Sequence, residues 1–275
     1  MDLPVDGGSL HVEEVGAGDV PVLLIQGLGH SHAGWCFQLE ALGAKRRTIA
    51  FDNRGTGRSS KKPGPYSMEQ FADDAVAVLD ALGVESAHVV GLSMGGFVAQ
   101  LVGLRAPERV VSLVLVGTSP GGDEHVPVPP ATLDEWTSNA HLAPEEFARR
   151  TMHLSYSEGW VEAHPELVEE LIAARVERPT PPECWRAQFA ATGPFLVAGV
   201  PVEEISAPVL VVHGDADRVV PFVNGLLLAR RIPGAELAVV PGCGHAVPLE
   251  VPGEFNSLVE AFFERVERTG APVPC

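Results

Sequence analysis

Short apolar runs recur along the chain and alternate with longer segments that have helical spacing. The runs are continuous and rich in β-branched residues, at 21–25, 47–51, 87–92, 111–117, 208–213 and 236–240. Runs that are apolar on both faces are typical of buried parallel strands. The intervening segments predict helices near 34–42, 67–82, 94–105, 222–231 and 253–267. This alternation predicts an α/β fold, with a mostly parallel twisted sheet covered by helices on both faces.

Two regions depart from the alternation. Residues 2–16 have the pattern of an antiparallel hairpin with a turn at Gly7-Gly8, which we expect at one edge of the sheet. From 121 to 206 no strand pattern occurs, and helices are predicted at 132–140, 144–154, 158–176 and 182–191. We interpret 121–206 as a helical cap, or lid, inserted before the late strands. Residues 1–120 and 207–275 then form the α/β core.

The charge of the chain excludes some classes of partner. The 275 residues carry a formal net charge of -17. A surface this acidic repels phosphate backbones and anionic membranes, so neither nucleic acid nor membrane is expected as a partner. Residues 121–206 contain 15 Asp or Glu and 5 Arg, which gives 5 − 15 = -10 of that charge. The count predicts poor tolerance for highly anionic substrates.

Cysteine use and the N-terminus predict a cytoplasmic protein. The four cysteines are far apart and form no CxxC pair, at 36, 184, 243 and 275. This pattern indicates neither a disulfide framework nor a zinc ribbon. The first residues lack the basic and apolar segments of a signal peptide, and no run of 18 apolar residues occurs.

The most specific chemical signal is a Gly-x-Ser-x-Gly motif, Gly91-Leu92-Ser93-Met94-Gly95. It ends an apolar run and begins a helical segment. A serine on a sharp strand-to-helix turn has an exposed hydroxyl, and the helix N-terminus directs free N–H groups at the reacting centre. Side chains at the two glycines would collide with the neighbouring helix or strand. We therefore predict that Ser93 is a nucleophile.

With these features the chain resembles the α/β-hydrolase family over nearly its whole length. The resemblance rests on the order of elements, the serine turn, the segment DNRGTGRS at 52–59 and the segment HGDAD at 213–217. Within the family it is most similar to bacterial esterases and enol-lactone hydrolases. Relatives that are haloalkane dehalogenases or epoxide hydrolases carry Asp where this chain has Ser93.

A serine hydroxyl needs a base, and the base needs a carboxylate that fixes its tautomer. His245 follows the last predicted strand in a glycine-rich loop and is the best candidate among ten histidines. The resemblance favours Asp217 as the acid, because it precedes a short apolar stretch that ends in Pro. Asp215 is the alternative and is expected to cap the turn. The order Ser93, Asp217, His245 is that of the family.

Two backbone N–H groups are expected to hold the oxyanion of acyl transfer. Met94 N–H, after the serine, is one. The loop after strand 21–25 supplies the other, Leu28 N–H. Many relatives have His-Gly at the end of this strand, whereas this chain has Gln26-Gly27. We expect Gln26 to keep a structural hydrogen bond.

Other candidate residues are expected to line a substrate pocket or to be structural. The pocket candidates are Gly27, His30, His32, Trp35, Trp136 and Trp160. His30 and His32 have a metal-like His-x-His spacing, but Gly34 and Trp35 follow where further ligands would be needed, so no metal is predicted. The glycine pairs near 27 and 55 are incomplete dinucleotide motifs, and no cofactor is predicted.

These features predict a serine hydrolase that cleaves a carboxylic ester, lactone or related acyl bond of a small apolar or moderately polar substrate. Two alternatives stay open. The same scaffold can serve perhydrolases, C–C bond hydrolases, lyases or cyclases. It can also serve as a ligand-binding protein that retains a slow triad.

Overall fold

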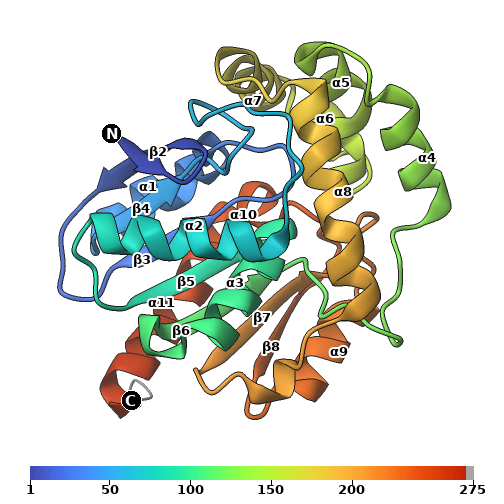
Figure 1. The fold of residues 1–275 in the computed structure, drawn as a ribbon. Helices are drawn as coiled ribbons and strands as arrows, with labels where there is room; N and C mark the ends of the chain where they lie inside the picture. Colours follow the sequence, from blue (N-terminus) through green and yellow to red (C-terminus); the bar gives the residue numbers. More distant parts are fainter. Residues whose placement is uncertain (271–275) are drawn as a thin grey trace.

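A computed structural model describes residues 1–270 and contains one eight-stranded sheet (Figure 1). The strands lie in the order β1-β2-β4-β3-β5-β6-β7-β8. Their bounds are Asp2–Val5, Gly8–Val15, Val22–Ile25, Thr48–Phe51, Ala87–Leu92, Val110–Val116, Val209–Gly214 and Glu236–Val240 for β1 to β8. All pairings from β4 to β8 are parallel. The predicted fold class is therefore confirmed, and the strand ends lie within a residue or two of those predicted.

The N-terminal hairpin forms one edge of the sheet, as the alternating pattern indicated. β1 pairs antiparallel with β2, and β2 pairs antiparallel with β4. Val5 is opposite Gly8, so the turn residues are Asp6 and Gly7 rather than the predicted Gly7-Gly8. An Asp-Gly pair suits the tight hairpin turn because Gly7 has a φ of 83°.

Helices cover both faces of the sheet. The helices α2 (Met68–Ala81), α3 (Met94–Arg105) and α9 (Val223–Arg231) contribute apolar side chains to one buried cluster. The helices α1 (Cys36–Gly43) and α11 (Pro252–Thr269) contribute to a second cluster. Because the two clusters use alternate residues of the same strands, the central strands are buried on both faces.

The segment between β6 and β7 contains helices only. They are α4 (Pro130–Asn139), α5 (Pro144–Thr151), α6 (Trp160–Ala163), α7 (Pro165–Glu177) and α8 (Pro182–Ala198), and they lie together at one side of the sheet (Figure 1). The α8 helix continues past the predicted end at 191 and through Gly193-Pro194, although Pro disfavours a helix interior. Phe195 explains the continuation, since its ring stacks on Phe97 of α3 with centroids 4.5 Å apart. The packing of Phe195 thus outweighs the helix-breaking tendency of Gly193-Pro194.

Short elements complete the described chain. The 3-10 turns are η1 (His32–Trp35), η2 (Pro107–Arg109), η3 (Met152–Ser155) and η4 (Val202–Glu204), and the helix α10 is Val247–Glu250. Within residues 1–270 no helix is long and apolar enough to span a membrane. The cysteines at 36, 184 and 243 are free, and Cys275 lies outside the described residues.

Candidate active site

Ser93 lies at the sharp turn between β5 and α3. Its φ is 56° and its ψ is -118°, and it is the one non-glycine residue with positive φ in the described chain. Such a backbone conformation is costly for a side-chain-bearing residue and is maintained only by its surroundings. The Ser93 N–H donates to Val116 O at 2.9 Å, and Thr118 Oγ1 donates to Ser93 O at 2.8 Å. Strand β6 and the residues after it therefore hold the turn.

The two motif glycines are required by close backbone contacts. A Cβ atom on Gly91 would lie 2.2 Å from Gly95 O in the first turn of α3. A Cβ atom on Gly95 would lie 2.1 Å from Ile25 O at the end of β3. Both distances are far below van der Waals contact with rigid backbone. The structural reason predicted for this motif is therefore the one observed.

His245 and Asp217 form a buried pair next to this turn. His245 Nδ1 lies 2.8 Å from Asp217 Oδ2. Because a carboxylate accepts, Nδ1 is the protonated nitrogen and Nε2 keeps its lone pair. Gly117 makes room for the pair: a Cβ atom there would lie 3.1 Å from His245 Nδ1. This is the tautomer that a general base needs.

Other groups hold Asp217 in place and charged. Its Oδ1 accepts from the N–H groups of Val219 and Val220, both at 2.8 Å. Its Oδ2 also lies 3.3 Å from His213 Nε2. Burial would raise the pKa of Asp217, but the charge of His245 and hydrogen bonds from His213 and His245 outweigh burial and lower the pKa to about 2. Asp217 is therefore ionised at neutral pH.

Asp215, the alternative acid, has a different role. Its Oδ1 accepts from Gly242 N–H at 2.6 Å, which is the turn-capping contact expected for it. Among the hydrogen bonds and ion pairs of the described residues, none joins Asp215 to a histidine. The geometry therefore favours Asp217 over Asp215.

The loop after β3 presents a free N–H beside Ser93. No hydrogen-bond partner is found among residues 1–270 for Leu28 N–H or Met94 N–H. Gln26 keeps a structural hydrogen bond, since its Oε1 accepts from Gly27 N–H at 2.8 Å. Gln188 of α8 holds the far end of the loop by accepting from Gly29 N–H at 2.9 Å. The geometry is compatible with an oxyanion site at these two N–H groups.

A cavity lies over Ser93, and residues of the segment between β6 and β7 line much of it. Ser93 and His245 both line it, and so do three of the predicted pocket residues: Gly27, His30 and Trp136. Further lining residues come mostly from the helical segment and were not singled out as site residues from the sequence: Phe147, Thr151, Met152, Tyr156, Arg175 and Trp185. Burial raises the pKa of Tyr156 to about 12, so its hydroxyl is neutral.

The other three pocket candidates lie elsewhere. Trp35 is fully buried in the cluster beneath α11, because η1 turns its ring towards the sheet. Trp160 is stacked between Tyr156 and His164, with centroids 4.2 and 4.4 Å apart. His32 is bound to Asp52, with Nδ1 to Oδ1 at 2.8 Å. None of the three lines the cavity over Ser93.

Arg175 gives the cavity an unexpected positive charge. Its Nη2 lies 2.9 Å from His30 Nε2, and no carboxylate pairs with it among the described residues. Burial, with the charge of Arg175, lowers the pKa of His30 well below its ordinary value, so His30 is neutral. No Asp or Glu of the described chain lines the cavity. The net negative charge of residues 121–206 is therefore not carried by the residues that line the cavity.

A sequence signal for Arg175 does exist. Arg149 and Arg150 each follow an acid by four residues on a helix, the spacing of a surface ion pair. Arg175 instead has Leu171 four positions before it and Pro179 four after it. A helical arginine without an acidic neighbour is a candidate for contact with a ligand.

Similarity to known proteins identifies the family of this chain. A family model described as alpha/beta hydrolase fold matches residues 20–252. The chain is a member of the α/β-hydrolase family. It is similar to a protein of Azorhizobium caulinodans named "Putative carbamate hydrolase RutD", at 32% identity over 94% of this chain and 96% of the relative. The family resemblance inferred from the sequence is thereby confirmed.

Two further proteins similar to this α/β hydrolase are named for different reactions. A 2-hydroxymuconate semialdehyde hydrolase of Pseudomonas sp. (strain CF600) is 32% identical over 94% of this chain and 91% of the relative. The crystal structure of the enol-lactonase from Burkholderia xenovorans LB400 has a TM-score of 0.82 at 26% identity, covering 96% of this chain and 100% of that one. The chain is a hydrolase, and its substrate is a separate question.

Proposed function

We propose that this α/β hydrolase is a serine hydrolase in which Ser93 attacks a carbonyl carbon, His245 is the base and Asp217 holds His245. One observation carries the proposal. The strained turn of Ser93 and the His245 side chain line the same cavity, with His245 Nδ1 bound to a buried carboxylate at 2.8 Å. This arrangement supports acyl transfer on a carboxylic ester, lactone or related acyl compound.

The reaction uses these groups in order. His245 Nε2 takes the Ser93 proton as Oγ bonds to the carbonyl carbon, and the N–H groups of Leu28 and Met94 stabilise the oxyanion. His245 then gives the proton to the leaving oxygen, whose bond to carbon breaks. Water adds to the acyl-serine by the same steps in reverse order, which releases the acid and restores Ser93.

Residues 121–206 act as the cap over this centre. Trp136, Phe147 and Trp185 belong to its helices and form apolar walls of the cavity. Such walls favour an apolar substrate portion and exclude water during the reaction. The cap therefore selects the substrate while the sheet supplies the catalytic groups.

A second candidate reaction is hydrolysis of a C–C bond next to a carbonyl in an anionic substrate. Arg175 is the specific observation that favours it, because an unpaired guanidinium in an apolar cavity suits a carboxylate or enolate. The relative from Pseudomonas sp. (strain CF600) is named for a 2-hydroxymuconate semialdehyde substrate. Both candidates use the same Ser93, His245 and Asp217.

A substrate panel separates the two candidates. It contains neutral esters and lactones of increasing acyl length, a carbamate, and a 2-hydroxy-6-oxo-dienoate. Turnover of neutral esters with little turnover of the dienoate supports the first candidate, and the opposite ranking supports the second. Tight binding with no turnover of any member would instead indicate a ligand-binding protein.

Ser93→Ala tests the nucleophile, with Ser155→Ala as its matched control because Ser155 lines the same cavity. We expect Ser93→Ala to lower kcat by several orders of magnitude on any accepted substrate and Ser155→Ala to change it less than tenfold. A fluorophosphonate should label Ser93 in the wild type and in Ser155→Ala. An adduct on another residue would refute the assignment.

A further inference from the structure

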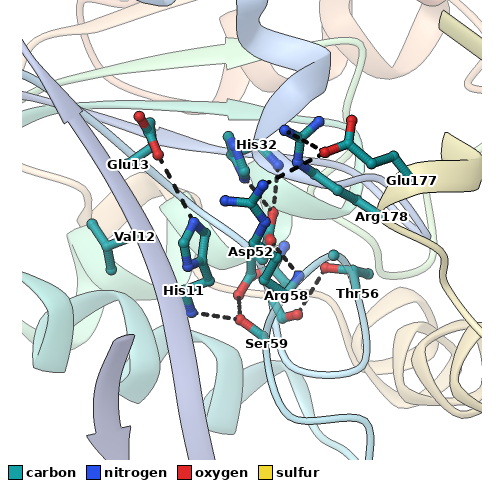
Figure 2. Close-up of polar contacts among 12 residues, drawn as sticks. His11, Val12, Glu13, His32, Asp52, Thr56, Arg58, Ser59, Glu177 and Arg178 are labelled. Carbon is teal, nitrogen blue, oxygen red and sulfur yellow. Dashed lines mark hydrogen bonds and ion pairs between the residues drawn. The ribbon is translucent and has the colours of Figure 1, made fainter. Parts of the chain in front are cut away.

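Three side chains of types that can bind metals lie close together in the fold: His11, Glu13 and His32. His11 and Glu13 are two residues apart on β2, so they point to the same side of the strand, and Val12 points to the other (Figure 2). His32, the first residue of η1, faces them. His11 is 8% exposed and His32 is 6% exposed, whereas the Glu13 side chain is 45% exposed.

Both histidines are held as metal-bound histidines usually are. His11 Nδ1 lies 2.7 Å from Asp2 Oδ1, and His32 Nδ1 lies 2.8 Å from Asp52 Oδ1. Since carboxylates accept, each Nδ1 carries the proton and each Nε2 keeps a lone pair. A carboxylate on the outer nitrogen fixes the tautomer and orientation of a metal-binding imidazole.

His11 Nε2 is the unexplained atom of this cluster. It is buried and has no hydrogen-bond partner in the described chain. Glu13 Oε2 lies 3.8 Å from it, which is too long for a hydrogen bond. Buried polar atoms are normally satisfied, so an orphaned lone pair beside a carboxylate and a second imidazole indicates a missing cation.

We propose that His11, Glu13 and His32 bind a divalent transition-metal ion, with zinc as the best fit to two imidazoles and one carboxylate. One donor atom of each residue lies within 4.8 Å of the others. Tetrahedral zinc with bonds of about 2.1 Å needs donors roughly 3.4 Å apart. The half-exposed Glu13 supplies most of this movement, and water takes the fourth position.

The ion would join two distant parts of the chain. His11, Glu13 and Asp2 belong to the edge hairpin, whereas His32 follows directly on the loop that contains Leu28. Metal binding therefore fixes the hairpin to η1 and stabilises the fold. The sequence predicts no metal at His30 and His32, because Gly34 and Trp35 follow where further ligands would be needed. His11 and Glu13 are far from His32 along the chain, so only the fold brings the three residues together.

Arg58 is the cation that opposes this site. Its charge acts on Asp2, and its guanidinium lies 3.6 Å from Glu177 Oε1 (Figure 2). Its side chain is half exposed and can turn away. A positive charge close to a cation site would weaken binding of the ion. Arg58→Ala should therefore bind the ion more tightly than the wild type.

The test uses the full chain without a histidine tag, treated with a chelator and then titrated with ZnCl2 in a calorimeter. A Cys36→Ser background removes the exposed thiol that could bind zinc itself. We expect one zinc per chain, and a rise in Tm of about 5 °C at a hundredfold excess over Kd. Co2+ should give the intense visible absorption of a tetrahedral site.

Glu13→Gln is the decisive variant, because Glu13 is exposed and its replacement keeps the fold. It should weaken zinc binding at least tenfold and lose most of the Tm rise, as should His32→Gln. His141→Ala, at an exposed histidine elsewhere, should behave as the wild type. Absence of stoichiometric binding, or equal binding by Glu13→Gln and the wild type, overturns the proposal. Neither result bears on Ser93.

Discussion

Two histidine–carboxylate pairs of the same length lie at different places in this molecule. His245 Nδ1 is 2.8 Å from Asp217 Oδ2, and His32 Nδ1 is 2.8 Å from Asp52 Oδ1. Both carboxylates also accept backbone N–H groups, and both histidines are buried. The pairs differ in what surrounds the second nitrogen. His245 lines a cavity with Ser93, whereas His32 faces His11 and Glu13.

The comparison teaches that a histidine–carboxylate pair does not by itself identify a base. The carboxylate fixes the tautomer in each case, so each Nε2 is an available lone pair. A serine hydroxyl beside that lone pair makes a nucleophile, while a second imidazole and a carboxylate make a metal site. The role of such a pair depends on which third group the fold brings beside the second nitrogen.

The largest expected effect is on kcat, and it should distinguish the His245–Asp217 pair from the His32–Asp52 pair. Asp217→Asn should lower kcat by roughly 10³ to 10⁴, because the amide favours the wrong tautomer of His245. Asp52→Asn should keep kcat within about tenfold while lowering the free energy of unfolding by about 1 to 3 kcal/mol, since a buried carboxylate loses its hydrogen bonds to His32 and Arg58. Kinetics and denaturant titration of both variants check this. Equal losses of kcat in the two variants would mean that the two pairs do not differ in their role in the reaction.

The next effect concerns the charge of the cavity. Arg175→Met keeps length and removes the guanidinium, so kcat/KM for an anionic substrate should fall by about 10- to 100-fold. A neutral ester of the same size should change less than about threefold. Arg178→Met is the matched control, because Arg178 lines the neighbouring cavity but not the one over Ser93. A uniform loss on both substrates would mean that Arg175 only supports the fold.

Asp217 should keep its negative charge to a lower pH than an ordinary aspartate. Asp217 has a pKa of about 2, below the 3.8 of an ordinary aspartate, so its charged form stabilises the folded state. That contribution is complete above pH 4 and is lost as pH falls towards 2, and it amounts to about 2 kcal/mol. The difference in unfolding free energy between wild type and Asp217→Asn should shrink by roughly two-thirds of this amount from pH 5 to pH 2.5, because pH 2.5 is still above the pKa of Asp217 in the folded state. A constant difference would contradict the assigned pKa.

A feature could be predicted from the sequence when residues close together along the chain determine it. The Ser93 turn could be predicted because the elements next to it require its glycines. The places of Asp217 and His245 at one edge of the sheet could be predicted because each lies in the loop after a strand. Parallel strands bring such ends to one edge.

Features that depend on distant contacts could not be predicted this way. Trp35 was a pocket candidate because it adjoins the oxyanion loop, but η1 turns it into the core. Arg175 could be singled out because it lacks an acidic neighbour on its helix, but its position over Ser93 depends on the orientation of α7, which no local pattern gives. The cluster of His11, Glu13 and His32 requires the pairing of β2 with β4, which only the folded sheet provides.

The smallest effect concerns His213, the second histidine on Asp217. Its Nε2 lies 2.9 Å from Val220 O and 3.3 Å from Asp217 Oδ2, so it positions the carboxylate without lining the cavity. His213→Leu should lower kcat about tenfold with KM unchanged, because Asp217 is held less firmly against His245. His213→Gln should recover most of the rate, since an amide N–H can replace the Nε2–H donor. A parallel rise in KM, or no recovery with Gln, would show that His213 supports packing rather than the orientation of Asp217.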